Sequence, residues 1–217
     1  QINLAAEKLK NSKQPIIISG GGVLYSEAEE EISNFAKKHN IPVTATVMGI
    51  GCMNKDDPYY ISAIGCLGEG SSNNLSRQTD LALAVGTKLS DFTTGSWTNF
   101  QHEDFQLISI NTSRFDTTKH RATPVVSDAK VGLQELSNAL GEWKAPDDWY
   151  NKAVQEKKIW DSYVAKESGP TNQELPSYAH AVGAVYRNAD ASDIVVTAAG
   201  GLVGEVVQIW KPKQLNT

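Results

Sequence analysis

Apolar residues follow two different periods along the first 140 positions. Short runs of consecutive apolar, often β-branched residues have the length of buried strands, and between them apolar residues recur every three or four positions, as on one face of a helix. The expected strands are residues 15–18, 42–47, 81–85, 106–110 and 124–126, with a short one near Ala63. The expected helices are residues 2–12, 26–39, 72–78 and 131–140. Strands that alternate with helices predict an α/β fold, with a parallel sheet of about six strands covered by helices on both faces.

The helix at 26–39 has the clearest start signal. Ser26 and Glu29 form an S-x-x-E pattern, in which the serine side chain and the glutamate side chain each bind a free backbone N–H of the first turn. Lys37 and Lys38 stand near the expected end, where a positive charge is favourable. A capping box at Ser26 is therefore expected.

After residue 141 the pattern changes. Residues 142–174 read as a polar connecting helix that begins at Pro146 and is anchored by a few large side chains, Trp149 and Trp160 among them. A second α/β pattern then follows at 175–217, with a helix at 176–187 and a strand at 193–197. One strand and one helix cannot bury their own apolar faces, so this segment is expected to be the truncated start of a further domain.

Composition narrows the classes of function. The chain has 217 residues, 40% of them hydrophobic and 21% charged, as in an ordinary globular protein with a substantial core. The net charge of -5, without a lysine or arginine cluster, argues against a nucleic-acid partner. The sequence contains no apolar run near 18 residues, and no leader in which charged residues precede an apolar stretch. We therefore expect no membrane association and a cytoplasmic location. Cys52 and Cys66 form no CxxC and the histidines form no HExxH, which predicts free, buried thiols and no metal site.

Two glycine loops stand where ligands bind in α/β sheets. Gly21 and Gly22 follow the first strand, Gly86 and Thr87 follow the strand at 81–85, and Asn111 follows the next strand. Backbone N–H groups of such loops can approach a phosphate, so these residues are candidates for cofactor binding. The letters GGGVLY lack the third glycine of G-x-G-x-x-G, and no acidic ribose partner stands about 20 residues further on. The alternative that these glycines only form a tight turn and bind no ligand therefore remains. No nucleophile and base are recognisably paired, so no catalytic residue is assigned within the chain.

The order of the motifs resembles a known family. In sequence, the chain reads PIIISGGGV, IPVTATVMGIG, GCMNKDDPYYISAIGCLG, DLALAVGTKLSDF and PVVSDAKVGLQEL. Over about residues 1–141 these segments resemble, collinearly, the central domain of thiamine-diphosphate-dependent enzymes. The resemblance implies a Rossmann-like, doubly wound central domain at 1–141, a connection at 142–174 and the start of the diphosphate-binding domain at 175–217. In some members of that family the central domain binds FAD or ADP, and in others it is structural.

Two further segments point to one branch of the family. They read LSDFTTGSWTNF at 89–100 and VVTAAGGLVGEVVQIW at 195–210, and they resemble enzymes that hydrolyse a ring C–C bond of a polyol-derived dione in inositol catabolism. The resemblance implies a small-molecule dione as substrate, thiamine diphosphate and Mg²⁺ as cofactors of the intact enzyme, and a homo-oligomer. It places Gly200 and Gly201 near the cofactor and Glu205 either as a helix cap or near the polyol substrate.

The family's other hallmarks are not found at the matching positions. The activating glutamate belongs to the domain before this one, and the metal-binding GDG…N signature lies further along the diphosphate-binding domain. We therefore expect neither cofactor to bind this chain tightly by itself. Two alternatives remain: a stand-alone module that binds ADP, FAD or NAD, and a purely structural assembly domain.

Overall fold

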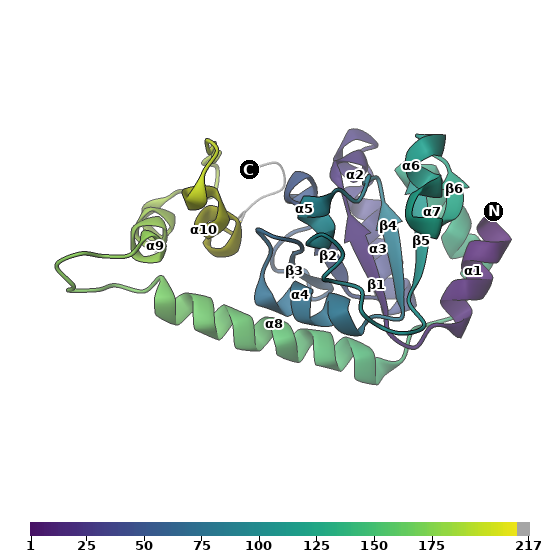
Figure 1. Ribbon diagram of the computed structural model, residues 1–217, viewed down its shortest axis with the longest axis horizontal. Helices are drawn as coiled ribbons and strands as arrows, with labels where there is room; N and C mark the ends of the chain where they lie inside the picture. Colours follow the sequence, from purple (N-terminus) through teal and green to yellow (C-terminus); the bar gives the residue numbers. More distant parts are fainter. Residues whose placement is uncertain (212–217) are drawn as a thin grey trace.

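The computed structural model describes residues 1–211. A six-stranded sheet lies at the centre of the first part of the chain, and α8 (Asp147–Glu167) extends away from it (Figure 1). The strands lie side by side in the order β3-β2-β1-β4-β5-β6, and every neighbouring pair is parallel. Their bounds are β1 (Pro15–Ser19), β2 (Val43–Ala45), β3 (Tyr60–Ala63), β4 (Leu81–Val85), β5 (Gln106–Asn111) and β6 (Thr123–Val126). The chain builds β1, β2 and β3 in one direction and then returns to the other side of β1 for β4, β5 and β6. The predicted α/β fold with a doubly wound parallel sheet is confirmed.

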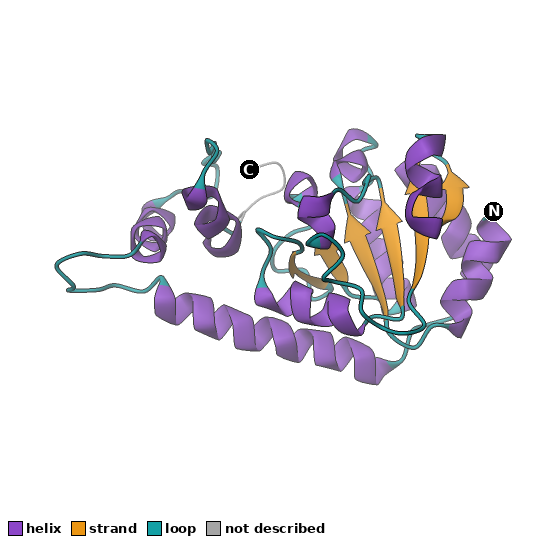
Figure 2. Ribbon diagram, viewed as in Figure 1, coloured by secondary structure: helices purple, strands orange, loops and turns teal. Residues whose placement is uncertain are grey.

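Helices cover both faces of the sheet (Figure 2). The first part of the chain contributes α1 (Ile2–Asn11), α2 (Gly21–Tyr25), α3 (Glu29–His39), α4 (Gly70–Gln78), α5 (Asp91–Thr94), α6 (Arg114–Thr118) and α7 (Ala129–Leu140), with 3-10 turns η1 (Val47–Gly49) and η2 (Lys119–Arg121). Helices α1, α3 and α7 share one apolar cluster with the sheet, and α4 and α8 (Asp147–Glu167) share the other. Both faces of the central strands are thus removed from water, as in other parallel sheets.

The alternation of side chains along β1 divides the core in two. Ile17 points into the cluster with α1, α3 and α7, while Ile16 and Ile18 point into the cluster with α4 and α8. All three are fully buried. Trp149 of α8 is buried in the second cluster, and its indole N–H donates a hydrogen bond of 2.8 Å to the carbonyl oxygen of Pro15. The helix predicted to be a connector is therefore joined to the sheet at its first turn.

The expected capping box at Ser26 is wrong. Residues 21–25 form the short helix α2, and Ser26 ends it by donating its backbone N–H to the carbonyl oxygen of Gly22. The hydroxyl of Ser26 donates instead to the carboxylate of Asp128, at 2.6 Å. Helix α3 begins at Glu29, after Ala28, and no side chain caps it. A hydroxyl held by Asp128 is not available to cap a helix that starts three residues later.

Beyond the sheet, α8 runs past the edge of the domain and leads to α9 (Tyr178–Asn188) and α10 (Gly201–Ile209), which pack on each other (Figure 1). The strand expected at 193–197 is not formed, and Ile194 and Val196 are 72% and 89% exposed. A strand needs a partner for its backbone groups, and none of the described strands lies beside this segment. No described helix combines the length and apolar content needed to cross a membrane.

The two thiols differ in exposure. Cys52 is buried as expected, and burial raises the pKa of its thiol to about 11. Cys66 is exposed, so the expectation of a second buried thiol is wrong. It stands in the turn after β3, outside both apolar clusters.

Candidate functional site

The direction in which successive strands are added to the sheet reverses between β1 and β4, and this place is the topological switch point of the sheet. The loop after β1 contains Gly20, Gly21 and Gly22, and the loop after β4 contains Gly86 and Thr87. Both loops leave the carboxyl edge of the sheet, and the crevice between such loops is where open α/β sheets bind ligands. A pocket of about 500 Å³ opens there. The structure thus brings together residues that are far apart in the sequence.

The predicted residues Gly21, Gly22, Gly86, Thr87 and Asn111 all line this switch-point pocket. Its other walls come from α2, from η1, from the turn after β3 and from the start of α5: Tyr25, Thr46, Val47, Met48, Ile64, Leu67, Lys88, Ser90, Phe92 and Thr93. None of these additional residues was singled out from the sequence as a site residue. The usable signal was their position, because they all lie in the segments that follow β1, β2, β3 and β4 and so reach the same edge.

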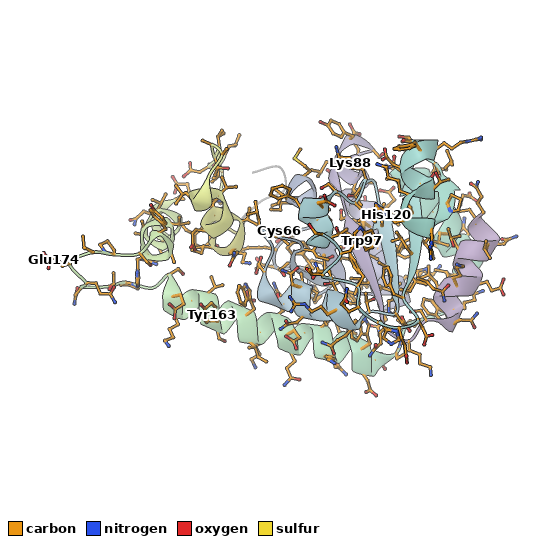
Figure 3. All side chains as sticks on the ribbon, viewed as in Figure 1. Cys66, Lys88, Trp97, His120, Tyr163 and Glu174 are labelled. Atoms are coloured by element: carbon orange, nitrogen blue, oxygen red, sulfur yellow. The ribbon has the colours of Figure 1, made fainter. Side chains whose placement is uncertain are left out.

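The lining is mainly apolar and open at its rim. Tyr25, Met48 and Phe92 are 89%, 70% and 69% exposed. Lys88 is the single charged side chain among the described residues of the lining, and Figure 3 shows it at the carboxyl ends of the strands. A ligand that fits this chemistry has an apolar or planar part and an anionic part.

The glycines bring the two loops into direct backbone contact. A Cβ atom on Gly22 would lie 2.6 Å from the Cα of Gly86, and one on Gly20 would lie 2.4 Å from the carbonyl oxygen of Gly86. Gly86 itself has a φ of +61°, which side-chain-bearing residues rarely adopt. The glycine pattern is therefore needed for the close approach of the loops, whether or not a ligand binds.

Most polar groups near the glycines are already bonded within the protein. The N–H of Gly20 donates to the carbonyl of Val85 at 2.8 Å, and that of Gly22 donates to the carbonyl of Gly86 at 2.9 Å. The amide of Asn111 donates to the carbonyl of Thr87 at 3.2 Å, and its oxygen accepts the N–H of Ser113 at 2.9 Å. Specificity for a ligand must therefore come chiefly from Lys88, from hydroxyl groups and from the apolar walls.

A carboxylate and a histidine with shifted pKa values both lie outside this pocket. Burial raises the pKa of Glu69 and lowers the pKa of His39. The ring of His39 is held on both sides, by the carbonyl oxygen of Trp143 at 2.8 Å and the hydroxyl of Ser137 at 2.9 Å. Neither Glu69 nor His39 lines the pocket, which therefore offers a place for binding rather than a pair of acid and base groups.

The remaining predicted residues lie elsewhere. Gly200, with a φ of +123°, precedes the first turn of α10, and Gly201 begins that helix. Both are exposed, and no atom lies within 4 Å of a Cβ atom built on either. Glu205 is half-buried on the same helix. None of these three residues lines the switch-point pocket, so the structure separates the predicted residues into two groups.

The N-terminus of α10 could accept an anion, because no side chain caps it. Within residues 1–211, no three His, Cys, Asp or Glu side chains are grouped as potential metal ligands. The uncapped backbone N–H groups at the start of α10 are therefore the feature of this segment that suits a diphosphate.

Comparison with known proteins finds one family model and a set of relatives that share one name. The model for "Thiamine pyrophosphate enzyme, central domain" matches residues 2–136. A 3D-(3,5/4)-trihydroxycyclohexane-1,2-dione hydrolase from Geobacillus thermodenitrificans is 31% identical over 98% of this chain and 36% of its own length. Enzymes of the same name from Clostridium tetani and Clostridium perfringens are 32% and 31% identical, over 98% and 95% of this chain and 37% and 36% of their own lengths. The chain thus spans just over a third of the length of these relatives.

Proposed function

This chain belongs to the thiamine pyrophosphate enzymes, and from that membership we propose that it is part of a hydrolase that opens the ring of 3D-(3,5/4)-trihydroxycyclohexane-1,2-dione. The observation that carries the proposal is the extent of the similarity to relatives of that name. It covers 98% of the chain, whereas the central-domain match ends at residue 136. The similarity therefore includes α8, α9 and α10, which a common central domain alone does not explain.

The proposed domain organisation follows the same boundaries. Residues 1–141 form the central domain, residues 142–174 connect it through α8, and residues 175–217 begin the diphosphate-binding domain. The exposed apolar surface of α9, α10 and the segment between them supports the last assignment. It lines a groove of about 1040 Å³ that includes Val185, Ile194, Leu202 and Trp210, as expected for an element that packs against further structure.

The cofactors of the intact enzyme would be thiamine diphosphate and Mg²⁺. When bound, thiamine diphosphate supplies the nucleophilic carbon needed to cleave a C–C bond beside a carbonyl group. Gly200 and Gly201 would let the first N–H groups of α10 approach the diphosphate, because neither carries a side chain that could block it. Glu205 would contact the polyol substrate or support the helix. The ligands for Mg²⁺ would come from outside residues 1–211.

An activity assay tests this proposal. A protein that contains this chain together with its flanking domains should convert the dione to 5-deoxyglucuronate in the presence of both cofactors. The variant Gly201→Val should reduce its turnover or raise its cofactor requirement without changing the melting of the central domain. The 217-residue chain alone should be inactive. Intact protein that leaves the dione unchanged would refute the substrate, and micromolar binding of thiamine diphosphate to the chain alone would refute the placement of the cofactor site.

The switch-point pocket supports a second candidate function, the binding of a nucleotide. Its volume, its apolar walls and Lys88 would suit a planar ring with an anionic group. ADP, FAD or NAD should then raise the melting temperature of the chain, since a ligand that binds only the folded state stabilises it by mass action. Lys88→Met should weaken that effect. The absence of any shift with all three nucleotides would favour a structural role for the domain.

A further inference from the structure

A carboxylate is buried at the point where the turn after β3 enters α4. Glu69 is 2% exposed, and its N–H donates to the carbonyl oxygen of Ala63 at 2.8 Å. The turn is held by Asn73, whose amide oxygen accepts the N–H of Gly65 and whose amide nitrogen donates to the carbonyl of Gly65, both at 3.0 Å. The backbone of Glu69 is therefore fixed by hydrogen bonds within the sheet domain.

The partner of this carboxylate comes from the other end of the described chain. Lys211 follows α10, and its Nζ donates to both carboxylate oxygens of Glu69, at 2.6 and 2.7 Å. The side chains of Glu69 and Lys211 are only 3% and 17% exposed. Among the described residues, no other hydrogen bond to the Glu69 carboxylate is present. The pair therefore joins two segments that are 142 residues apart, in a place largely shielded from water.

Other charges around Glu69 do not replace this contact. Lys157 of α8 is a second cation that lowers the pKa of Glu69, but its Nζ donates to the carbonyl of Ile61 at 3.1 Å and lies 3.6 Å from Asp161. Burial raises the pKa of Glu69, and Lys211 is the largest influence in the opposite direction. If Lys211 lost its charge while α10 stayed docked, the buried carboxylate would lose both of its hydrogen bonds to Lys211, which is unfavourable for the docked state.

The same turn touches both α10 and the switch-point pocket. A Cβ atom on Gly204 of α10 would lie 3.6 Å from the side chain of Leu67, and Leu67 also lines the pocket. A second contact joins Lys55, in the loop before β3, to the hydroxyl of Tyr186 on α9, at 3.1 Å. The turn at 65–69 thus lies between the candidate site and the C-terminal helices.

We propose that the Glu69–Lys211 ion pair is a latch that fixes α10 against this turn, so that the docking of α10 and the shape of one pocket wall depend on each other. Its two halves belong to different parts of the chain: Glu69 is held by the sheet, and Lys211 arrives only when α10 is docked. The latch requires no assumption about the reaction, because it concerns contacts within residues 1–211.

Hydrogen exchange measured on the 217-residue chain tests the latch. The variants are Lys211→Met, Glu69→Gln and the double variant, and Lys166→Met serves as the control because its side chain is 84% exposed. Each single variant should accelerate amide exchange in 203–209 and 66–69 by roughly tenfold or more, because removal of one partner leaves the other buried and unpaired. Exchange in β4 and β5 should not change. The double variant should be affected less than the product of the single effects, since neither charge is then left alone.

Three results would overturn the proposal. Exchange in 203–209 within about twofold of the Lys166→Met control would show that the ion pair does not hold α10. Faster exchange in α10 with an unchanged turn would disprove the coupling to the pocket wall. Single effects that simply multiply in the double variant would show that the two residues act independently. If Glu69→Gln also accelerates exchange in β4 and β5, the result for Lys211→Met decides whether the latch exists, because Lys211 lies outside the sheet domain.

Discussion

Replacing Gly22 with alanine tests whether the two glycine loops touch as the structure shows. The new Cβ atom would lie 2.6 Å from the Cα of Gly86 and 2.9 Å from its carbonyl oxygen. Both are backbone atoms, so no flexible side chain can move aside. The loops would have to separate, and the hydrogen bond from the N–H of Gly22 to Gly86 would lengthen.

The size of the effect follows from these contacts. Overpacking of a tight site destabilises a protein by about 1–3 kcal/mol, and the weakened hydrogen bond adds about 1 kcal/mol. The better helix propensity of alanine offsets up to about 1 kcal/mol. Because the overlap is with backbone, we expect the free energy of unfolding to fall by about 2–3 kcal/mol. For a chain of this size, that lowers the melting temperature by roughly 4–12 °C.

Gly21→Ala is the matched control, one residue away in the same helix. Its Cβ atom would lie 3.1 Å from the carbonyl oxygen of Met48 and 3.5 Å from the Met48 Cβ, so a shift of a few tenths of an ångström relieves the contact. The free energy of unfolding should change by less than about 1 kcal/mol in either direction. Urea unfolding followed by circular dichroism measures both variants. Equal stability of Gly22→Ala and Gly21→Ala would refute the close backbone contact between the loops.

Three further outcomes are expected. Burial lowers the pKa of His39 below the ordinary histidine value of about 6.5, so the unfolded chain binds the proton more tightly. The stability linked to this residue is therefore complete above about pH 6.5 and is lost as the pH falls through the lowered pKa. Urea titrations at about pH 7.5 and 5.5 should therefore show a smaller loss in His39→Gln than in the wild type, and equal losses would contradict the assignment. A thiol reagent near pH 8 should label Cys66 rapidly and Cys52 only on unfolding, so Cys66→Ser should abolish the fast phase; a fast phase that persists would mean that Cys52 is accessible. Trp149→Phe should lower the free energy of unfolding by about 1–3 kcal/mol in the same urea assay, because the buried hydrogen bond from the indole N–H to the carbonyl oxygen of Pro15 is lost. An unchanged urea midpoint would show that this bond does not anchor α8.

The layered architecture and the location of the pocket could be predicted from the sequence. Runs such as PIII and LALAV are apolar at every position because both faces of those strands are covered, and this requirement is visible locally. Once the strands are parallel, every loop that follows a strand reaches the same edge. The prediction that Gly21, Gly22, Gly86, Thr87 and Asn111 line one pocket there therefore depended on topology and not on a specific motif.

Other features depended on partners that are distant in the sequence. Ser26 was expected to cap α3, but Asp128 engages its hydroxyl from 102 residues away. The segment at 193–197 has the composition of a strand, yet composition cannot supply the neighbouring strand that its backbone needs. The exposure of Cys66 likewise depends on how the turn after β3 is packed.

The contact between Glu69 and Lys211 shows the same division most clearly. Neither residue stands in a pattern that distinguishes it from the other charged residues of the chain, and 142 positions separate them. Local sequence determines which elements form, because periodicity and turn chemistry act over a few residues. Only the packing of those elements removes water from Glu69 and brings a single lysine to it, because burial and charge pairing depend on distances in space and not along the chain.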